Sequence, residues 1–222
     1  MTRSTCSLTE TGPAGSHVAR PLPFQTLVLA TGNHKKCVEL RQLLLPLGVG
    51  LLSLAEVGDP LEVQETGTTF IENARLKATQ QAQHLQQWTI GEDSGLCVPY
   101  LEGAPGVFSA RYSDPGATDD RNNEKLLNEM TAATGEQRRA YYVSTIVLSS
   151  PDGCIHVEAE GRCWGRIISE YRGSGGFGYD PLFEIPEYHQ TFAELGLAVK
   201  AVLSHRGRAL AIFLRRLLAL AS

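Results

Sequence analysis

The chain has 222 residues, of which 42% are hydrophobic and 20% charged, and its formal net charge is -4. This composition is typical of a globular protein and excludes wholesale disorder or a fibrous repeat. The acidic balance argues against a broad nucleic-acid-binding surface, because polyanion binding needs many Lys and Arg contacts to phosphate. The five cysteines include no C-x-x-C pair, which disfavours a disulfide framework and a zinc site and favours a reducing compartment.

The two ends of the chain suggest no targeting or membrane segment. Residues 1–25 are rich in Ser, Thr, Gly and Pro and have no hydrophobic period, which predicts a flexible leader before a single domain at 26–222. The leader lacks the apolar core of a signal peptide, and Arg215 and Arg216 interrupt the apolar C-terminal stretch. We therefore expect no membrane partner and a cytoplasmic location.

Hydrophobic periodicity and turn residues predict an alternation of strands and helices along the domain. Thr69 followed by Glu72 is a capping-box signature for a helix start, and Pro151-Asp152-Gly153 is a turn signal between two β-rich runs. Helices mixed with both hairpins and crossovers predict an α/β protein with a mixed sheet. The expected segments are a strand at 27–30, a turn at 31–33, helices at 38–47 and from 69, extended segments at 89–92 and 96–101 with a loop or strand edge at 92–95, a helix at 118–130, a hairpin at 141–149 and 155–168, an extended segment at 182–186 and a closing helix after 204.

The turn Thr31-Gly32-Asn33-His34-Lys35-Lys36 has the components of a phosphate-binding site. Its small residues expose backbone N–H groups, the helix that follows carries a partial positive charge at its start, and the lysines add full charges. The turn does not match the Walker A pattern, so the alternative is an ordinary strand-to-helix turn.

Two adjacent carboxylates, Glu92 and Asp93, precede a glycine. Carboxylate oxygens suit Mg²⁺, and a carboxylate can accept a proton from water. A solvated turn is the alternative, but apolar Ile90 and Leu96 flank the pair, and charges held beside a core usually have a partner. A further acid, Glu65, stands just before another predicted helix.

The segment Gly173–Gly178 formally matches the dinucleotide-binding pattern G-x-G-x-x-G. We reject that interpretation because an extended segment follows it where the pattern requires a helix. A loop that lets the backbone approach a ligand fits better, with Phe177 and Tyr179 available to stack on a base. A purely structural turn is the alternative.

Lys200, His205 and Arg206 surround the start of the last predicted helix. Lys and Arg side chains have no acceptor atoms, so these donors suit a ligand rich in carbonyl or phosphate oxygens. A solvated helix end is the alternative. The other histidines show no metal-ligand spacing.

Taken in order, these segments resemble the inosine/xanthosine triphosphate pyrophosphatase family. The resemblance covers nearly the whole chain after the leader, and the ordered set of motifs is specific although each motif alone is weak. The matching segments are Thr31-Gly32-Asn33 with Lys36 and Glu39, Glu65-Thr66-Gly67, Phe70 to Ala74, Lys77-Ala78, Asp93 to Leu96, Gly103 to Gly106, Ser109 to Tyr112, Gly176 to Pro181, Lys200, and Ser204 to Gly207.

The resemblance implies hydrolysis of ITP, dITP or XTP to the monophosphate and pyrophosphate, on Mg²⁺, by a homodimer. The implied fold is a long mixed β-sheet with flanking helices that form two lobes around a nucleotide-binding cleft. Asp93 is implied as metal ligand and general base and Glu65 as a further acid at the metal, while Glu92 stands where the family often has Asp and completes the expected metal set. Lys36 and Lys77 are implied as catalytic phosphate ligands. The other implied substrate-binding residues are Thr31, Gly32, Asn33, His34, Lys35, Ser94, Phe177, Gly178, Tyr179, Asp180, Lys200, His205 and Arg206.

The hydrogen-bond donors at the implied nucleoside site indicate which purine bases bind. Hypoxanthine and xanthine offer a 6-oxo acceptor, whereas the amino group of adenine would leave cationic donors unpaired. This argument rejects ATP but does not by itself reject GTP. The stretch Gly196–Val199 is more apolar than the acidic segment usual in the family. A related pyrophosphatase for modified pyrimidine triphosphates and a non-catalytic nucleotide sensor remain as alternatives, and the preferred base stays open.

Overall fold

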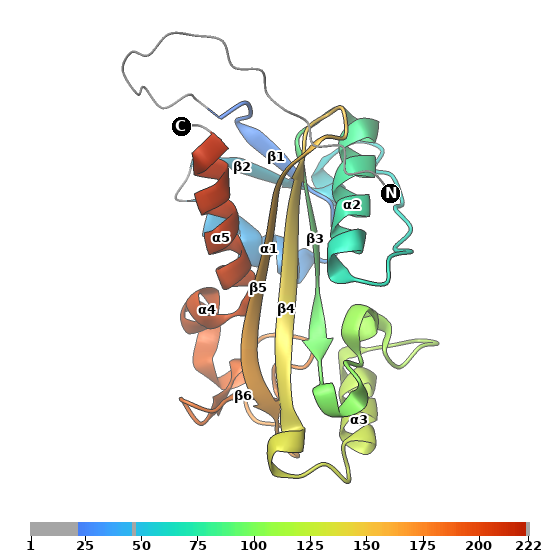
Figure 1. Ribbon diagram of the computed structural model, residues 1–222, viewed down its shortest axis with the longest axis vertical. Helices are drawn as coiled ribbons and strands as arrows, with labels where there is room; N and C mark the ends of the chain where they lie inside the picture. Colours follow the sequence, from blue (N-terminus) through green and yellow to red (C-terminus); the bar gives the residue numbers. More distant parts are fainter. Residues whose placement is uncertain (1–21, 46–47, 221–222) are drawn as a thin grey trace. The chain divides into compact units, whose positions relative to one another are not determined.

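The computed structural model describes residues 22–45 and 48–220 (Figure 1). Most of the predicted leader, residues 1–21, lies outside this part of the chain. Phe24, which lies within the leader predicted at 1–25, is buried, and its ring centroid lies 5.2 Å from that of Trp88. The described residues form two compact units. Unit 1 contains the residues up to Glu92, residues 145–159 and those from Leu210, whereas unit 2 contains residues 93–144 and 160–209.

The strands belong to one mixed sheet. They are β1 (Thr26–Leu29), β2 (Gly50–Ser53), β3 (Thr89–Cys97), β4 (Arg139–Ser149), β5 (Ile155–Ile167), β6 (Phe183–Ile185) and β7 (Gln190–Thr191). Within the described residues the sheet has seven strands in the order β2-β1-β3-β4-β5-β6-β7. β1 is parallel to β2 and β3, whereas β6 is antiparallel to β5 and β7. This arrangement confirms the predicted mixed α/β sheet.

The first three helices each begin after a residue whose side chain caps the helix N-terminus. The helices are α1 (His34–Leu44), α2 (Phe70–Leu85), α3 (Asp119–Glu129), α4 (Phe192–Leu203) and α5 (His205–Leu220). Asn33 caps α1, and Thr118 caps α3. Thr69 and Glu72 form the predicted capping box of α2. Over the described residues, no helix has both the length and the apolar character needed to cross a membrane.

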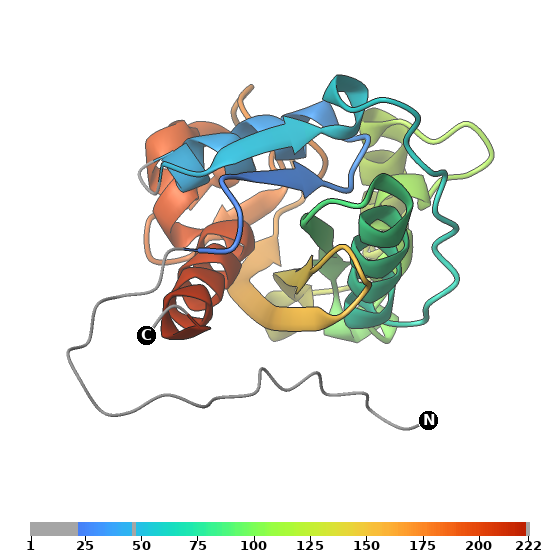
Figure 2. The same cartoon turned by 90° about the horizontal axis from the view of Figure 1, so that it is seen from above.

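In unit 1, α2 packs against β3 at Gly91, and Figure 2 shows the helix beside this strand from above. A Cβ atom at Gly91 would lie 2.1 Å from the carbonyl oxygen of Ala74 and 2.6 Å from the backbone nitrogen of Ala78. Ala74 and Ala78 are fully buried and pack in one cluster with Val147 of β4. The lack of a side chain at Gly91 therefore sets how closely α2 approaches the sheet.

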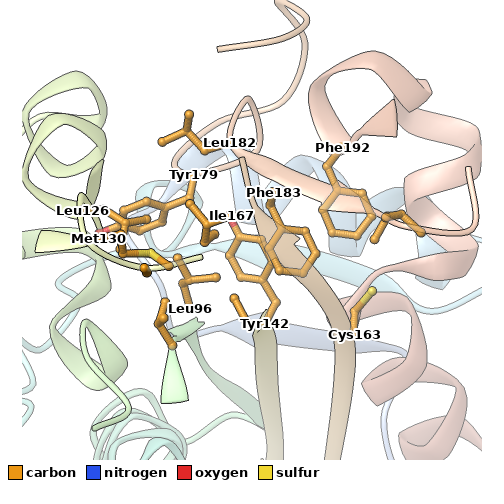
Figure 3. Packing of buried hydrophobic residues seen from close by; sticks show 14 residues of the cluster. Leu96, Leu126, Met130, Tyr142, Cys163, Ile167, Tyr179, Leu182, Phe183 and Phe192 are labelled. Atoms are coloured by element: carbon orange, nitrogen blue, oxygen red, sulfur yellow. The ribbon is translucent and has the colours of Figure 1, made fainter. Parts of the chain in front are cut away.

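In unit 2, aromatic rings hold β4, β6 and α4 together (Figure 3). The ring of Tyr142 lies 4.6 Å from that of Phe183, which in turn stacks 5.3 Å from Phe192. Gly161 of β5 lets α5 begin close to the sheet, since a Cβ there would lie 2.4 Å from the carbonyl oxygen of His205. The start of α5 is thereby fixed against the inner face of β5.

The structure corrects two expectations. Residues 92–95 form no loop, because β3 runs without interruption from Thr89 to Cys97. Gly95 suggested a turn, but it does not adopt positive φ and remains extended. The extended segment expected at 96–101 ends at Cys97, and Pro99–Leu101 form a 3-10 turn. Sequence patterning also missed β2 and α4, and α4 contains a break at Gly196, where φ is 75°.

We expect Gly91→Ala to destabilise the protein by about 1–3 kcal/mol, because the new methyl group would meet backbone atoms of α2 that cannot rotate away. The free energy of unfolding in urea measures this effect. Gly58→Ala is the control, since no atom lies within 4 Å of a Cβ at Gly58. Equal stability of the two variants would contradict the close packing of α2 on β3.

Candidate functional site

The turn between β1 and α1 is an exposed helix start in unit 1. The backbone nitrogen of Asn33 donates to Thr31 Oγ1 at 3.2 Å, and Asn33 Oδ1 accepts from the backbone nitrogen of Lys36, also at 3.2 Å. No atom lies within 4 Å of a Cβ at Gly32, so the turn is open at its tip. His34 and Lys35 are exposed in the first turn of α1. The segment therefore presents backbone donors and positive charge at one helix terminus, as a phosphate site requires.

Lys36 reaches from α1 to β3. Its Nζ lies 2.7 Å from Glu92 Oε2, and the side chain of Glu92 is fully buried whereas that of Lys36 is 14% exposed. A buried carboxylate is costly without a positive partner, so Lys36 neutralises Glu92 in this structure.

Lys77 forms a second ion pair in unit 1. Its Nζ donates to Glu65 Oε1 at 2.9 Å, with the Lys77 side chain 10% exposed. The segment that carries Glu65 is fixed to α2, because the backbone nitrogen of Gly67 donates to Asn73 Oδ1 at 2.8 Å. Lys77 projects from the turn of α2 that packs on Gly91, so the helix–strand contact also positions this lysine.

Asp93 is buried next to Glu92 in β3, at the start of unit 2. Successive side chains of a strand point to opposite faces of the sheet, so Glu92 shares a face with Ser94 and Asp93 points to the other. Among the described residues, no group of three or more His, Cys, Asp or Glu side chains is arranged to hold a metal ion. Mg²⁺ does not need such a group, because it binds through one or two carboxylates together with phosphate oxygens and waters. The carboxylates of Glu65, Glu92 and Asp93 have the hard oxygen donors that suit it.

A buried ion pair lies at the centre of the candidate nucleoside-binding residues in unit 2. Lys200 Nζ donates to Asp180 Oδ2 at 2.6 Å, and both side chains are at most 5% exposed. Asp180 Oδ2 also accepts from the backbone nitrogen of Phe177 at 2.8 Å. The Phe177 ring covers the pair, with Lys200 Nζ 4.6 Å and Arg206 Cζ 5.9 Å from its centroid. Phe177 is therefore an aromatic face held beside two cations.

His205 and Arg206 begin α5 and are both buried. The His205 ring stacks on Tyr142 with centroids 4.7 Å apart and an interplanar angle of 12°. Complete burial raises the pKa of Tyr142 well above its usual value, so this tyrosine is a neutral platform for His205. Arg206 Nη2 donates to Ser94 Oγ at 3.1 Å. Ser94, Arg206 and His205 thus belong to one connected polar region.

Tyr179 and Gly178 are held by neighbouring elements of unit 2. Tyr179 is 3% exposed, and its hydroxyl donates to the carbonyl oxygen of Ser109 at 2.8 Å, so its ring is part of the core. The backbone nitrogen of Gly178 donates to Asp119 Oδ2 at 2.9 Å, and its carbonyl oxygen accepts from Asn123 Nδ2 at 3.0 Å. Sequence analysis missed Asp119, Asn123 and Tyr142 as supports of the site. The only sequence signal for any of them was the acidic first turn of the helix predicted at 118–130, which contains Asp119.

The structure therefore brings the predicted residues together in two groups, one in each unit. Lys36 pairs with Glu92 and Lys77 with Glu65 in unit 1. The unit 2 group joins Lys200 to Asp180 and Arg206 to Ser94, with Phe177 beside both cations. The catalytic, metal-binding and substrate-binding roles of these residues stay predictions.

Comparison with known proteins links the chain to one family. A family model described as the Ham1 family matches residues 27–216. The chain is 52% identical over 194 residues to a dITP/XTP pyrophosphatase of Rhodopirellula baltica, which covers 87% of this chain and 93% of that protein. Identity to a dITP/XTP pyrophosphatase of Thermus thermophilus is 50% over 185 residues, covering 83% of this chain and 87% of that protein. The fold is similar to that of a HAM1 protein from Coxiella burnetii, with a TM-score of 0.77, 37% identity and coverage of 85% of this chain and 95% of that chain. The Staphylococcus aureus Ham1 protein gives a TM-score of 0.74 with 36% identity and coverage of 86% and 96%.

We expect Lys200→Met to destabilise the protein by about 3–5 kcal/mol, because it leaves the Asp180 carboxylate buried without its ammonium partner. The double variant Lys200→Met/Asp180→Asn should lose less, since the amide is neutral and still accepts from Phe177. Urea unfolding measures both. Glu136→Gln, which breaks the exposed ion pair with Arg139, is the control and should change stability by less than about 1 kcal/mol. A double variant no more stable than Lys200→Met would show that the buried charge is not the cause.

Proposed function

Because the chain belongs to the Ham1 family, we propose that it hydrolyses deaminated purine nucleoside triphosphates, dITP or ITP and XTP, to the monophosphate and pyrophosphate. The most direct support is the similarity to relatives named dITP/XTP pyrophosphatase, which extends over most of the chain. The pairing of Lys36 and Lys77 with acidic side chains supports the proposal from the structure. Removal of these nucleotides from the pool is the consequence of the reaction.

In this proposal, the phosphates bind in unit 1 to the residues of the turn at 31–36 and to Lys77. The N-terminus of α1 offers backbone N–H groups and a partial positive charge, while Lys36 and Lys77 offer full charges. Hydrolysis between the α- and β-phosphates needs this neutralisation and a group that orients and deprotonates water. Asp93, a buried carboxylate of β3, takes that last role.

The proposed cofactor is Mg²⁺, held by carboxylates from the set Glu65, Glu92 and Asp93, of which Glu92 and Asp93 point to opposite faces of β3 and so do not bind the same ion together. Once bound, it supplies charge neutralisation at the phosphates and lowers the pKa of water. The Ham1 relatives and the oxygen donors of these acids support this assignment. We further propose a homodimer in the cytoplasm. Among the described residues, no disulfide bond joins Cys37, Cys97, Cys154 or Cys163, which fits a reducing compartment.

The proposed base-recognition residues lie in unit 2. Arg206 and Lys200 provide donors to the 6-oxo group of hypoxanthine or xanthine, His205 adds a ring nitrogen, and Phe177 provides an aromatic face. A donor buried to this degree loses its partner when an amino group replaces the oxo group, which costs about 1–3 kcal/mol. This penalty is the basis for discrimination against adenine nucleotides.

Pyrophosphate release from a panel of triphosphates tests the activity. We expect turnover of dITP, ITP and XTP in the presence of Mg²⁺ and little turnover of dATP or of modified pyrimidine triphosphates. Asp93→Asn should abolish turnover while nucleotide binding remains measurable, because the substitution removes a proton acceptor and metal ligand with little change in volume. Near-normal rates in this variant at saturating Mg²⁺ would remove Asp93 from catalysis. Preference for the pyrimidines, or binding without turnover by the unmodified protein, would favour the two alternative functions instead.

Arg206→Ala should narrow the ratio of kcat/KM between ITP and ATP. The substitution removes a hydrogen bond for ITP and relieves a mismatched donor for ATP, so the two efficiencies move toward each other. Arg208→Ala is the matched control, because Arg208 is an exposed arginine of the same helix. Melting temperatures establish that both variants fold. An unchanged ratio would assign Arg206 to phosphate binding or to structure and leave Lys200 and His205 as the base-recognition candidates.

A further inference from the structure

The glycine-rich loop of unit 2, residues 173–178, contains Phe177, and Asp180 stands two residues after its end. The base of the loop is closed, because the backbone nitrogen of Arg172 donates to the carbonyl oxygen of Pro181 at 3.0 Å. Within the loop, the backbone nitrogen of Phe177 donates to Asp180 Oδ2 at 2.8 Å. The position of the whole loop therefore determines where the Phe177 ring and the Asp180 carboxylate lie.

The glycine-rich loop packs with its backbone on the first turn of α4. A Cβ atom at Gly173 would lie 2.6 Å from the carbonyl carbon of Ala193, and one at Gly175 would lie 2.9 Å from the Ala193 carbonyl oxygen. The backbone nitrogen of Gly175 donates to that oxygen at 3.2 Å, and the backbone nitrogen of Ala193 donates to the carbonyl oxygen of Asp180 at 3.3 Å. These contacts join backbone to backbone, so the loop follows the start of α4.

Arg172, the residue just before the loop, contacts both β6 and the start of α4. Its Nη2 donates to Glu184 Oε1 at 2.6 Å, and its Nε lies at an ion-pair distance of 3.7 Å from Glu194 Oε2. Its carbonyl oxygen accepts from Thr191 Oγ1 at 2.8 Å. Glu194 Oε2 also accepts from the backbone nitrogen of Thr191 at 2.7 Å, in the capping box that begins α4. Arg172 thus links the loop to β6 and to the cap of the helix on which the loop packs.

Glu184, the partner of Arg172 on β6, has a second arginine beside it. Its side chain is 3% exposed and pairs with Arg166 of β5 as well as with Arg172. Burial alone would raise the pKa of Glu184, but hydrogen bonds from the two arginines lower it below its usual value, so the carboxylate is ionised. The two arginines share this partner, but only Arg172 continues directly into the glycine-rich loop. They therefore form a matched pair for separating charge compensation from loop position.

We propose that Arg172 is a positioning residue for base recognition, which holds the glycine-rich loop where Phe177 and Asp180 can serve the base. The proposal rests on the proposed function and adds a residue outside the set assigned to nucleotide contacts. The alternative role of Arg172 is to compensate the charge of Glu184. That role needs no contact with Glu194 or with the helix cap, whereas the planar guanidinium has donors for two acidic partners at once.

Hydrogen exchange of the ligand-free protein tests the positioning without any need for activity. Arg172→Met should speed amide exchange in peptides from residues 173–180 at least about 10-fold, because their acceptors depend on the position of the loop on α4. Arg166→Met is the matched control, since it removes the other partner of Glu184 and should leave this exchange unchanged. If Arg172→Met fails to fold, Arg172→Lys replaces it, because the lysine keeps a cation beside Glu184. Equal loop exchange in the two variants would overturn the proposal.

Kinetics with ITP and Mg²⁺ test the consequence for recognition. We expect Arg172→Met to raise KM about 10-fold and to change kcat less than about 2-fold, because it disturbs the candidate base-recognition residues and leaves the phosphate-binding candidates of unit 1 intact. The inhibition constant of inorganic tripolyphosphate, which has no base, should stay unchanged. Arg166→Met should keep a normal KM, and gel filtration checks that both variants assemble as the unmodified protein does.

Two kinetic results would overturn the role of Arg172. One is a normal KM for ITP in Arg172→Met, and the other is a tripolyphosphate inhibition constant that rises by the same factor as KM, which would indicate a general structural loss. A lack of turnover by the unmodified protein would contradict the proposed function instead. The hydrogen-exchange comparison would then still decide whether Arg172 positions the loop.

Discussion

The close approach of helices to strands at two glycines is the constraint on which the rest of the structure depends. At Gly91 the backbone of α2 occupies the space that a side chain would need, and at Gly161 the start of α5 does the same. Lys77 lies on α2 between the residues that contact Gly91, and His205 and Arg206 lie at the start of α5, where the helix contacts Gly161. The positions of these candidate site residues are therefore set by backbone packing and not by flexible loops. This kind of support holds a site within narrow tolerances.

Each unit contains a buried or largely buried ion pair. Lys36 with Glu92 and Lys200 with Asp180 each combine an ammonium and a carboxylate that are largely shielded from water. Such pairs are a weak source of stability, because desolvation offsets the attraction between the charges. Their position among the candidate phosphate-binding and nucleoside-binding residues fits a role in ligand binding. Under the proposed function, these are the cations that a nucleotide contacts.

Much of the fold followed from local signals, and the exceptions have identifiable causes. Thr69 and Thr118 indicated helix starts correctly because their side chains act within one turn. Gly95 was misleading: glycine is the usual residue of turns, but here it lies inside the continuous strand β3. The family resemblance identified the candidate site residues. Their ion pairs, such as that of Lys36 with Glu92, could not be predicted because they depend on tertiary packing. Supporting residues such as Asn123 were missed because a buried amide on a helix has no distinctive spacing.

The ion pair between Lys36 and Glu92 has a consequence for selectivity. An anion that arrives at Lys36 must compete with a carboxylate already in contact with the ammonium group, so binding is an exchange of counter-ions. A ligand with several negative charges wins this exchange more readily than one with few, which favours a triphosphate over a monophosphate. The exchange also leaves Glu92, whose side chain is fully buried, in need of another positive partner. Anion and cation binding at this position are therefore thermodynamically coupled, and each raises the affinity for the other by the same factor.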